Sequence, residues 1–99
     1  MALIEILTET EEEHGWRFAV RVSEDAAQAS PPKDLTITLS WADYDLWCRG
    51  SSPPEAVAKR VIEYLLTQRP LGEIPTRFDA AKVRMWYGGV DGALGRAGT

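Results

Sequence analysis

Residues 35–48, LTITLSWADYDLWC, decide the fold, because a strand pattern gives way within them to a helical turn. In the first half, large apolar residues alternate with threonine and serine, which predicts a strand with one apolar and one polar face. The alternation stops at the two aspartates around Tyr44, and we expect one of these aspartates to cap a short helical turn. The predicted strand ends near Trp41, and its core-facing residues are Leu35, Ile37, Leu39 and Trp41.

Two further strands precede this stretch. Residues 3–8 are mostly apolar, and residues 16–22 alternate strictly, with Trp16, Phe18, Val20 and Val22 on one side. The acidic segment from Thr10 to Gly15 joins them, which predicts a hairpin with a turn longer than the tight two-residue kind. Residues 23–33, SEDAAQASPPK, are small and polar and end in two prolines and a lysine, so we expect a mobile surface loop.

Two helices are predicted after the third strand. The sequence Ser52-Pro53-Pro54-Glu55 is typical of a capping box, with Ser52 as the N-cap and Pro53 at the first helical position. An apolar stripe at helical spacing follows, and it consists of Val57, Ala58, Val61, Ile62, Leu65 and Leu66. This helix is expected to end at Arg69-Pro70, and a shorter one to run from Asp79, as N-cap, to about Tyr87.

These elements predict an α+β fold. We expect a three-stranded antiparallel sheet (β-β-β), one long amphipathic helix packed on its apolar face, and a short C-terminal helix. Residues 1–90 would form a single domain, and the glycine-rich residues 91–99 a flexible C-terminal tail.

Composition narrows the class of protein. The 99 residues are 44% hydrophobic and 26% charged, as in an ordinary soluble globular domain. No apolar run is long enough to span a bilayer, and no secretory signal pattern opens the chain, so we expect no membrane association and a cytoplasmic location. The single cysteine, Cys48, allows no disulfide framework within the chain.

Charge is distributed unevenly along the chain. The net charge is −4, but residues 1–48 contain ten acidic and three basic residues, whereas residues 49–99 contain five acidic and eight basic residues. Such a dipolar chain could associate head to tail or meet a charged partner. Alternatively, the two halves fold together and their charges mix on one surface.

No residue pattern indicates catalysis or a cofactor. His14, the only histidine, stands beside Glu11, Glu12 and Glu13, but neighbouring carboxylates in one turn rarely converge on a metal ion. Asp43 and Asp45 are two residues apart and do not face each other, and Cys48 has no adjacent base. We therefore expect no enzyme activity, metal or cofactor, and we interpret Cys48 as a small buried residue.

Aromatic residues are the best candidates for a contact surface. Trp41, Tyr44 and Trp47 recur every three residues, so they either line the core or anchor a partner. The possible partner-contact residues are Trp41, Tyr44, Trp47, Trp86 and Tyr87. The leading hypothesis is a small non-enzymatic interaction or regulatory module, acting as an adaptor or as a homodimer.

A weak nucleic-acid-binding domain is the alternative. The basic C-terminal half could supply phosphate contacts, and Trp86 and Tyr87 could stack on bases. The candidate cations are Lys59, Arg60, Arg69, Arg77, Lys82 and Arg84. The sequence pI of about 4.9 argues against this alternative, because dedicated nucleic-acid binders are usually basic.

Taken in order, several of these segments resemble a family of short uncharacterised bacterial proteins. The shared features are a TLS-x-x-DY turn at Thr38–Tyr44, a Pro-Glu helix start at Pro54-Glu55, a leucine-rich helix end at Leu65-Leu66 and an FD segment at Phe78-Asp79. The resemblance covers roughly residues 16–94, and the chain departs from it at Gly88, where the family has proline. It implies a stand-alone bacterial domain and brings no activity, cofactor or catalytic residue.

Overall fold

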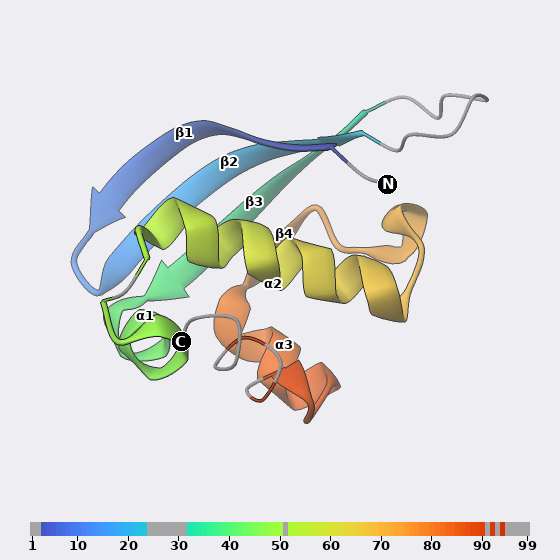
Figure 1. The fold of residues 1–99 in the computed structure, drawn as a ribbon. Coiled ribbons are helices and arrows are strands. Elements are labelled where there is room, and N and C mark those ends of the chain that lie inside the picture. Colours follow the sequence, from blue (N-terminus) through green and yellow to red (C-terminus); the bar gives the residue numbers. More distant parts are fainter. Residues whose placement is uncertain (1–2, 24–31, 51, 91, 93, 95–99) are drawn as a thin grey trace.

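The computed structural model describes residues 3–23, 32–50, 52–90, 92 and 94 (Figure 1). Four strands form one sheet in the order β1-β2-β3-β4, and helix α2 lies across one face of it (Figure 1). In chain order the elements are β1 (Leu3–Glu12), β2 (Gly15–Ser23), β3 (Lys33–Ser40), α1 (Trp41–Cys48), α2 (Pro54–Gln68), the 3-10 turn η1 (Leu71–Glu73), β4 (Arg77–Asp79) and α3 (Ala80–Trp86). None of the helices within these described ranges is long and apolar enough to cross a membrane.

The α+β class is confirmed, but the prediction of three antiparallel strands is wrong. The first three strands are antiparallel, whereas β4 joins the sheet parallel to β3, with Phe78 beside Ile37. The two-helix prediction is also wrong, because residues 41–48 form a separate helix, α1. A strand of three residues is too short to show an alternating pattern, so β4 left no periodic signal in the sequence.

The β1–β2 hairpin is tighter than expected. Strand β1 continues to Glu12, which pairs with Gly15, so only Glu13 and His14 form the turn. A register shift at Leu7, between Ile6 and Thr8, is a β-bulge. The acidic residues remain in the strand because at this sheet edge they are exposed to water and nothing penalises their charge.

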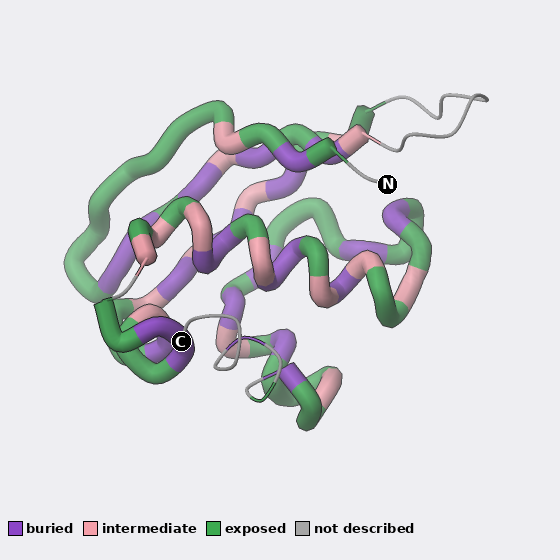
Figure 2. The backbone as a smooth tube through the Cα atoms, in the orientation of Figure 1, coloured by how far each residue is buried: buried purple, intermediate pink, exposed green. Residues whose placement is uncertain are grey.

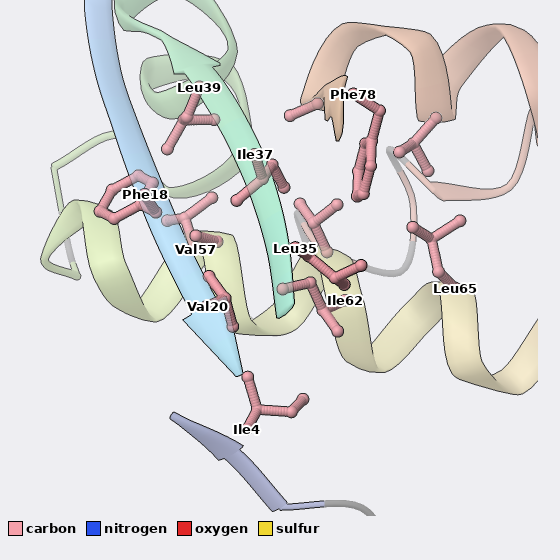
Figure 3. Close-up of a cluster of buried hydrophobic side chains, with 14 of the residues drawn as sticks. Ile4, Phe18, Val20, Leu35, Ile37, Leu39, Val57, Ile62, Leu65 and Phe78 are labelled. Carbon is pink, nitrogen blue, oxygen red and sulfur yellow. The ribbon is translucent and has the colours of Figure 1, made fainter. Parts of the chain in front are cut away.

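The core forms between the sheet and α2, as the alternation predicted. All four predicted inward residues of β2 are buried, and so are Leu35, Ile37 and Leu39 of β3. Figure 3 shows Phe18, Val20 and Ile37 among the side chains packed with Val57 and Ile62 of α2. Each fully buried valine, leucine or isoleucine contributes about 1.5–3 kcal/mol relative to an exposed one, so this layer dominates the stability of the fold.

The helix starts differ from those predicted. Ser40, not an aspartate, caps α1 by accepting a hydrogen bond from the Asp43 backbone N–H at 3.1 Å. Helix α2 begins at Pro54 after Pro53 and has no side-chain cap, so the predicted capping box at Ser52 is wrong. The Ser52 hydroxyl instead accepts a hydrogen bond from Arg60 at 3.1 Å, which keeps it from the helix N-terminus. The predicted Asp79 cap of the last helix is confirmed, since its carboxylate accepts from the Ala81 N–H at 2.8 Å.

Two segments with sequence-based predictions fall largely outside the description. Residues 24–31 of the predicted loop and residues 91, 93 and 95–99 of the predicted tail lie outside the described residues. Val90 and Leu94 are described, and both belong to the buried hydrophobic cluster. The C-terminal part of the chain therefore contributes to the core at these two positions.

Gly15 occupies a position where no side chain fits, and this gives a test of the pairing between β2 and β3. A Cβ at Gly15 would lie 2.0 Å from the Leu39 carbonyl oxygen on the paired strand, whereas one at Gly72 would meet nothing within 4 Å. We expect Gly15→Ala to lower the free energy of unfolding by about 1–3 kcal/mol, as overpacking does. Urea denaturation measures the change. Gly72→Ala is the matched control, and an equal effect of both substitutions would contradict the steric argument.

Candidate functional site

The predicted aromatic residues of α1 divide between the core and the surface. Trp47 is 1% exposed and lines the core, whereas Trp41 is 50% exposed. Trp41 is therefore not an inward residue of β3 as expected, because the Ser40 cap starts α1 at this position. The Trp41 ring stacks on the Trp16 ring, with the two centroids 4.9 Å apart. The Tyr44 ring meets the Trp16 ring edge-on, with a centroid distance of 5.1 Å. Trp41 and Tyr44 thus cover Trp16.

The other two predicted contact residues lie in a separate region. Trp86 is 40% exposed, and its ring centroid lies 6.0 Å from that of Phe78. Tyr87 packs edge-on against Tyr64 at 6.2 Å and accepts a hydrogen bond from the Arg69 Nε. Within the described part of the chain, no ring contact joins either residue to Trp41 or Tyr44. The five residues do not form one aromatic contact surface through their rings, and their role in partner contact stays a prediction.

Asp43 has a structural role. It is the buried polar residue of the described core, and its Oδ1 lies 3.0 Å from the Arg84 guanidinium, so the ion pair joins α1 to α3. Asp45 is exposed on the same helix. A buried carboxylate is stable only when it is paired, so Arg84 holds α3 against the start of α1.

Half of the candidate nucleic-acid-binding cations already have partners within the fold. Arg60 binds Ser52, Arg69 binds Tyr87 and Arg84 binds Asp43. Arg69 also lies over the Tyr87 ring, with its guanidinium carbon 5.3 Å from the ring centroid. These contacts stabilise the packing of the C-terminal half, and the nucleic-acid alternative stays a prediction.

The histidine and the cysteine lie on different elements, one at the tip of the hairpin and the other at the end of α1. The His14 side chain is 87% exposed at the hairpin tip, and its Nε2 lies 4.0 Å from the Glu13 carboxylate. The Cys48 thiol is buried and donates to the Ser52 carbonyl, with sulfur and oxygen 3.7 Å apart. Across the described ranges, no three histidine, cysteine, aspartate or glutamate residues are grouped closely enough to hold a metal ion.

The feature that sequence reasoning missed is the edge of β1, which pairs with β2 and with no other strand among the described residues. The strand order leaves β1 at one border of the sheet, while the other border is the three-residue β4. Along its ten residues only Ile4 is buried and Ile6 half-buried, and Figure 2 shows the hairpin end of the strand exposed. Leu3 and Leu7 are 60% and 43% exposed. The order of strands in a sheet cannot be deduced from local sequence. However, four glutamates within one strand are typical of an edge strand exposed to solvent.

A hollow of about 410 Å³ adjoins the hairpin end of this edge. Its lining consists of Glu12, Glu13, His14, Gly15, Trp16, Thr38, Leu39, Ser40 and Asp79. Three of these residues are carboxylates and none is lysine or arginine. The Thr38 hydroxyl donates to Asp79 at 2.9 Å.

The charges along β1 are only partly neutralised. Glu12 lies 3.2 Å from Arg17 on the neighbouring strand. Arg21, across from Glu5, is held mainly by Asp34 at 2.9 Å, and this hydrogen bond lowers the pKa of the Asp34 carboxyl. Glu9 and Glu11 form no ion pair with any described residue. The hairpin end of the edge is therefore net acidic.

Comparison with known proteins adds no relative. No protein-family model, curated protein or solved structure matches the chain. The resemblance to a family of short bacterial proteins therefore stays a prediction, and functional inference rests on the geometry described above.

The two tryptophans of α1 should differ sharply in their effect on stability. Trp47→Ala removes a fully buried ring, and we expect it to cost about 3–5 kcal/mol. Trp41→Ala removes one half-exposed ring from the stack on Trp16, and we expect a cost of about 1 kcal/mol. Denaturant unfolding followed by circular dichroism measures both. A larger cost for Trp41 than for Trp47 would contradict the assignment of Trp47 to the core.

The free energy of unfolding should depend on pH in the alkaline range because of Tyr44. Burial, and secondarily the hydrogen bond with Cys48, raise the pKa of the Tyr44 phenol, whose hydroxyl donates to the Ser52 carbonyl at 2.5 Å. Because the folded pKa lies above the unfolded value of about 10, the neutral phenol stabilises the fold below pH 10, and this contribution is lost as pH rises through the folded pKa. A difference titration of tyrosinate absorbance between the protein and Tyr44→Phe should show a phenol titrating above pH 10. A difference centred at or below that pH would contradict the prediction.

Proposed function

We propose that the chain is a small non-enzymatic interaction module, and that a partner protein adds an extended segment to the free edge of β1. The observation that carries the proposal is an exposed strand of ten residues at the border of the sheet. An edge strand presents a row of unpaired backbone N–H and C=O groups, which is the recognition element used in strand addition.

The geometry of β1 suits this mode of binding. Ten residues at about 3.3 Å per residue give an edge of roughly 33 Å, long enough for several main-chain hydrogen bonds. The strand is held firmly on its other side, because it pairs with β2 from Leu3 to Glu12. A partner segment would therefore meet a prearranged template, and the template itself would lose little conformational entropy on binding.

Side chains next to the edge add selectivity. Ile4 and Ile6 face the helix-covered side, while Leu3 and Leu7 remain exposed. The bulge at Leu7 interrupts the regular ladder, and natural edges use bulges and charged residues to avoid pairing with identical edges. These features favour the adaptor form of the hypothesis over a homodimer built through β1.

Selection from a random linear peptide display library, followed by hydrogen exchange of the complex, tests the proposal. We expect selected peptides to slow amide exchange within Leu3–Glu12 more than within α1 or α3, because only the edge gains main-chain partners. Versions of the same peptides with proline at alternate positions should lose binding, since proline cannot donate to a ladder. Protection confined to α1 or α3, or undiminished binding of the proline versions, would contradict edge addition.

A further inference from the structure

We infer that the segment bound by β1 has two chemically distinct halves, apolar opposite Leu3–Leu7 and basic opposite Glu9–Glu13. This inference rests on the proposed function and specifies the partner for that same edge. It follows from how the bulge at Leu7 divides β1 into two parts with different side chains on the same face of the sheet.

The first part of β1 presents apolar side chains. Ile4 pairs with Val22 and Ile6 with Val20, so both continue the helix-covered face outward to the sheet border. Ile4 is 7% exposed and Ile6 is half-buried, and neither is shielded by a further strand. A strand added here would place every second side chain beside these isoleucines, where apolar side chains bury the most surface.

The second part of β1 presents carboxylates on the same face. The register shift places Glu9 opposite Phe18 and Glu11 opposite Trp16, so the row of Ile4 and Ile6 continues as two glutamates. Both side chains are exposed, and neither carboxylate forms an ion pair with a described residue. Lysine or arginine side chains on an added strand would lie directly across from them, where opposite charges attract.

The hollow extends the acidic surface to the other face at the hairpin end. Glu12 and Glu13 border both the edge and the hollow, and Asp79 completes its lining. Arg17 neutralises only Glu12 in part. Basic side chains on either face of an added strand would therefore find carboxylates near the hairpin, and a long lysine or arginine could reach into the hollow.

The same charges argue against a second copy as the occupant. Strand β1 contains four glutamates and no basic residue, so the edge of a second copy would supply no cation to Glu9 and Glu11. An antiparallel pair of edges would place these carboxylates beside the apolar half of the other copy, and a parallel pair would place them beside one another. A nucleic acid would be repelled by the carboxylates of this edge. The occupant that the observations favour is a basic, partly apolar extended segment of a different protein.

Two synthetic peptides of about ten residues provide the probe. They share an apolar half of alternating valine and threonine, and the other half alternates threonine with lysine in one peptide and with glutamate in the other. Each peptide is also made with the halves in reverse order, because either strand direction can pair. We expect the lysine peptide to bind at least about tenfold more tightly than the glutamate peptide, with the difference shrinking at high salt through screening. Fluorescence anisotropy of the labelled peptides measures both affinities.

Matched variants locate the charge effect. Glu9→Gln with Glu11→Gln should weaken the lysine peptide about fivefold or more, because the carboxylates opposite it are lost. Glu63→Gln with Glu73→Gln removes the same charge from exposed positions on α2 and η1 and should leave the affinity unchanged. Equal losses from the two double variants would overturn the inference, since the effect would then arise from net charge alone.

The outcomes separate this inference from the proposed function. If the two peptides bind equally and both slow exchange within Leu3–Glu12, the edge is a binding site but the basic preference is wrong. If neither binds while library-selected peptides protect β1, the inference alone fails. If the lysine peptide binds but protects another element, both the proposed function and the inference fail.

Discussion

The packing of α2 on one face of the sheet is the interaction on which the rest of the structure depends. Val57 and Ile62 are fully buried and lie beside residues of β2 and β3, so these two strands have a fixed inward face (Figure 3). A shift of either strand by one residue would turn that face toward water, and burial therefore fixes the register. The positions of α1 and α3 follow, because each is connected directly to the end of a registered strand, β3 and β4 respectively.

This packing also explains why β1 is open. Helix α2 covers the centre of the sheet, so β1 gains burial only at Ile4 and in part at Ile6 (Figure 2). Beyond the bulge every residue of β1 is exposed, so the carboxylates of Glu9 and Glu11 stay in water and carry no desolvation cost. The exposure of β1 and its acidic composition thus both follow from the limited extent to which α2 covers the sheet. Both features distinguish this border from the opposite one, which is the three-residue β4.

The parts of the fold that could be predicted from the sequence are those where burial of one face makes apolar residues recur at a regular spacing. Strand β2 alternates and the stripe of α2 recurs over several turns, and their inward residues are buried as expected except Leu66, which is half-buried. Trp41 was misplaced because Ser40 can continue an alternating strand or cap a helix, and only the hydrogen bond to the Asp43 N–H decides between them. Strand β4 was missed because three residues hold no period, and its place is fixed by non-local contacts such as the Thr36 N–H bonded to the Thr76 carbonyl at 2.7 Å.

The candidate site could not be predicted for a related reason. Taken locally, the glutamate-rich residues 9–13 are typical of a turn. In the structure residues 9–12 belong to β1 and pair with β2, and only Glu13 lies in the turn. Their role depends on strand order, which places these residues at a border of the sheet where no further described strand pairs with them. Among the aromatic residues that stand out in the sequence, Trp47 fills the core, whereas Trp41 stacks on Trp16 and stays half-exposed, so a partner contact by these residues remains a prediction. The charged strand β1 is typical of a solvated surface, and among the described strands it lies at a border of the sheet, where an edge strand presents unpaired backbone N–H and C=O groups.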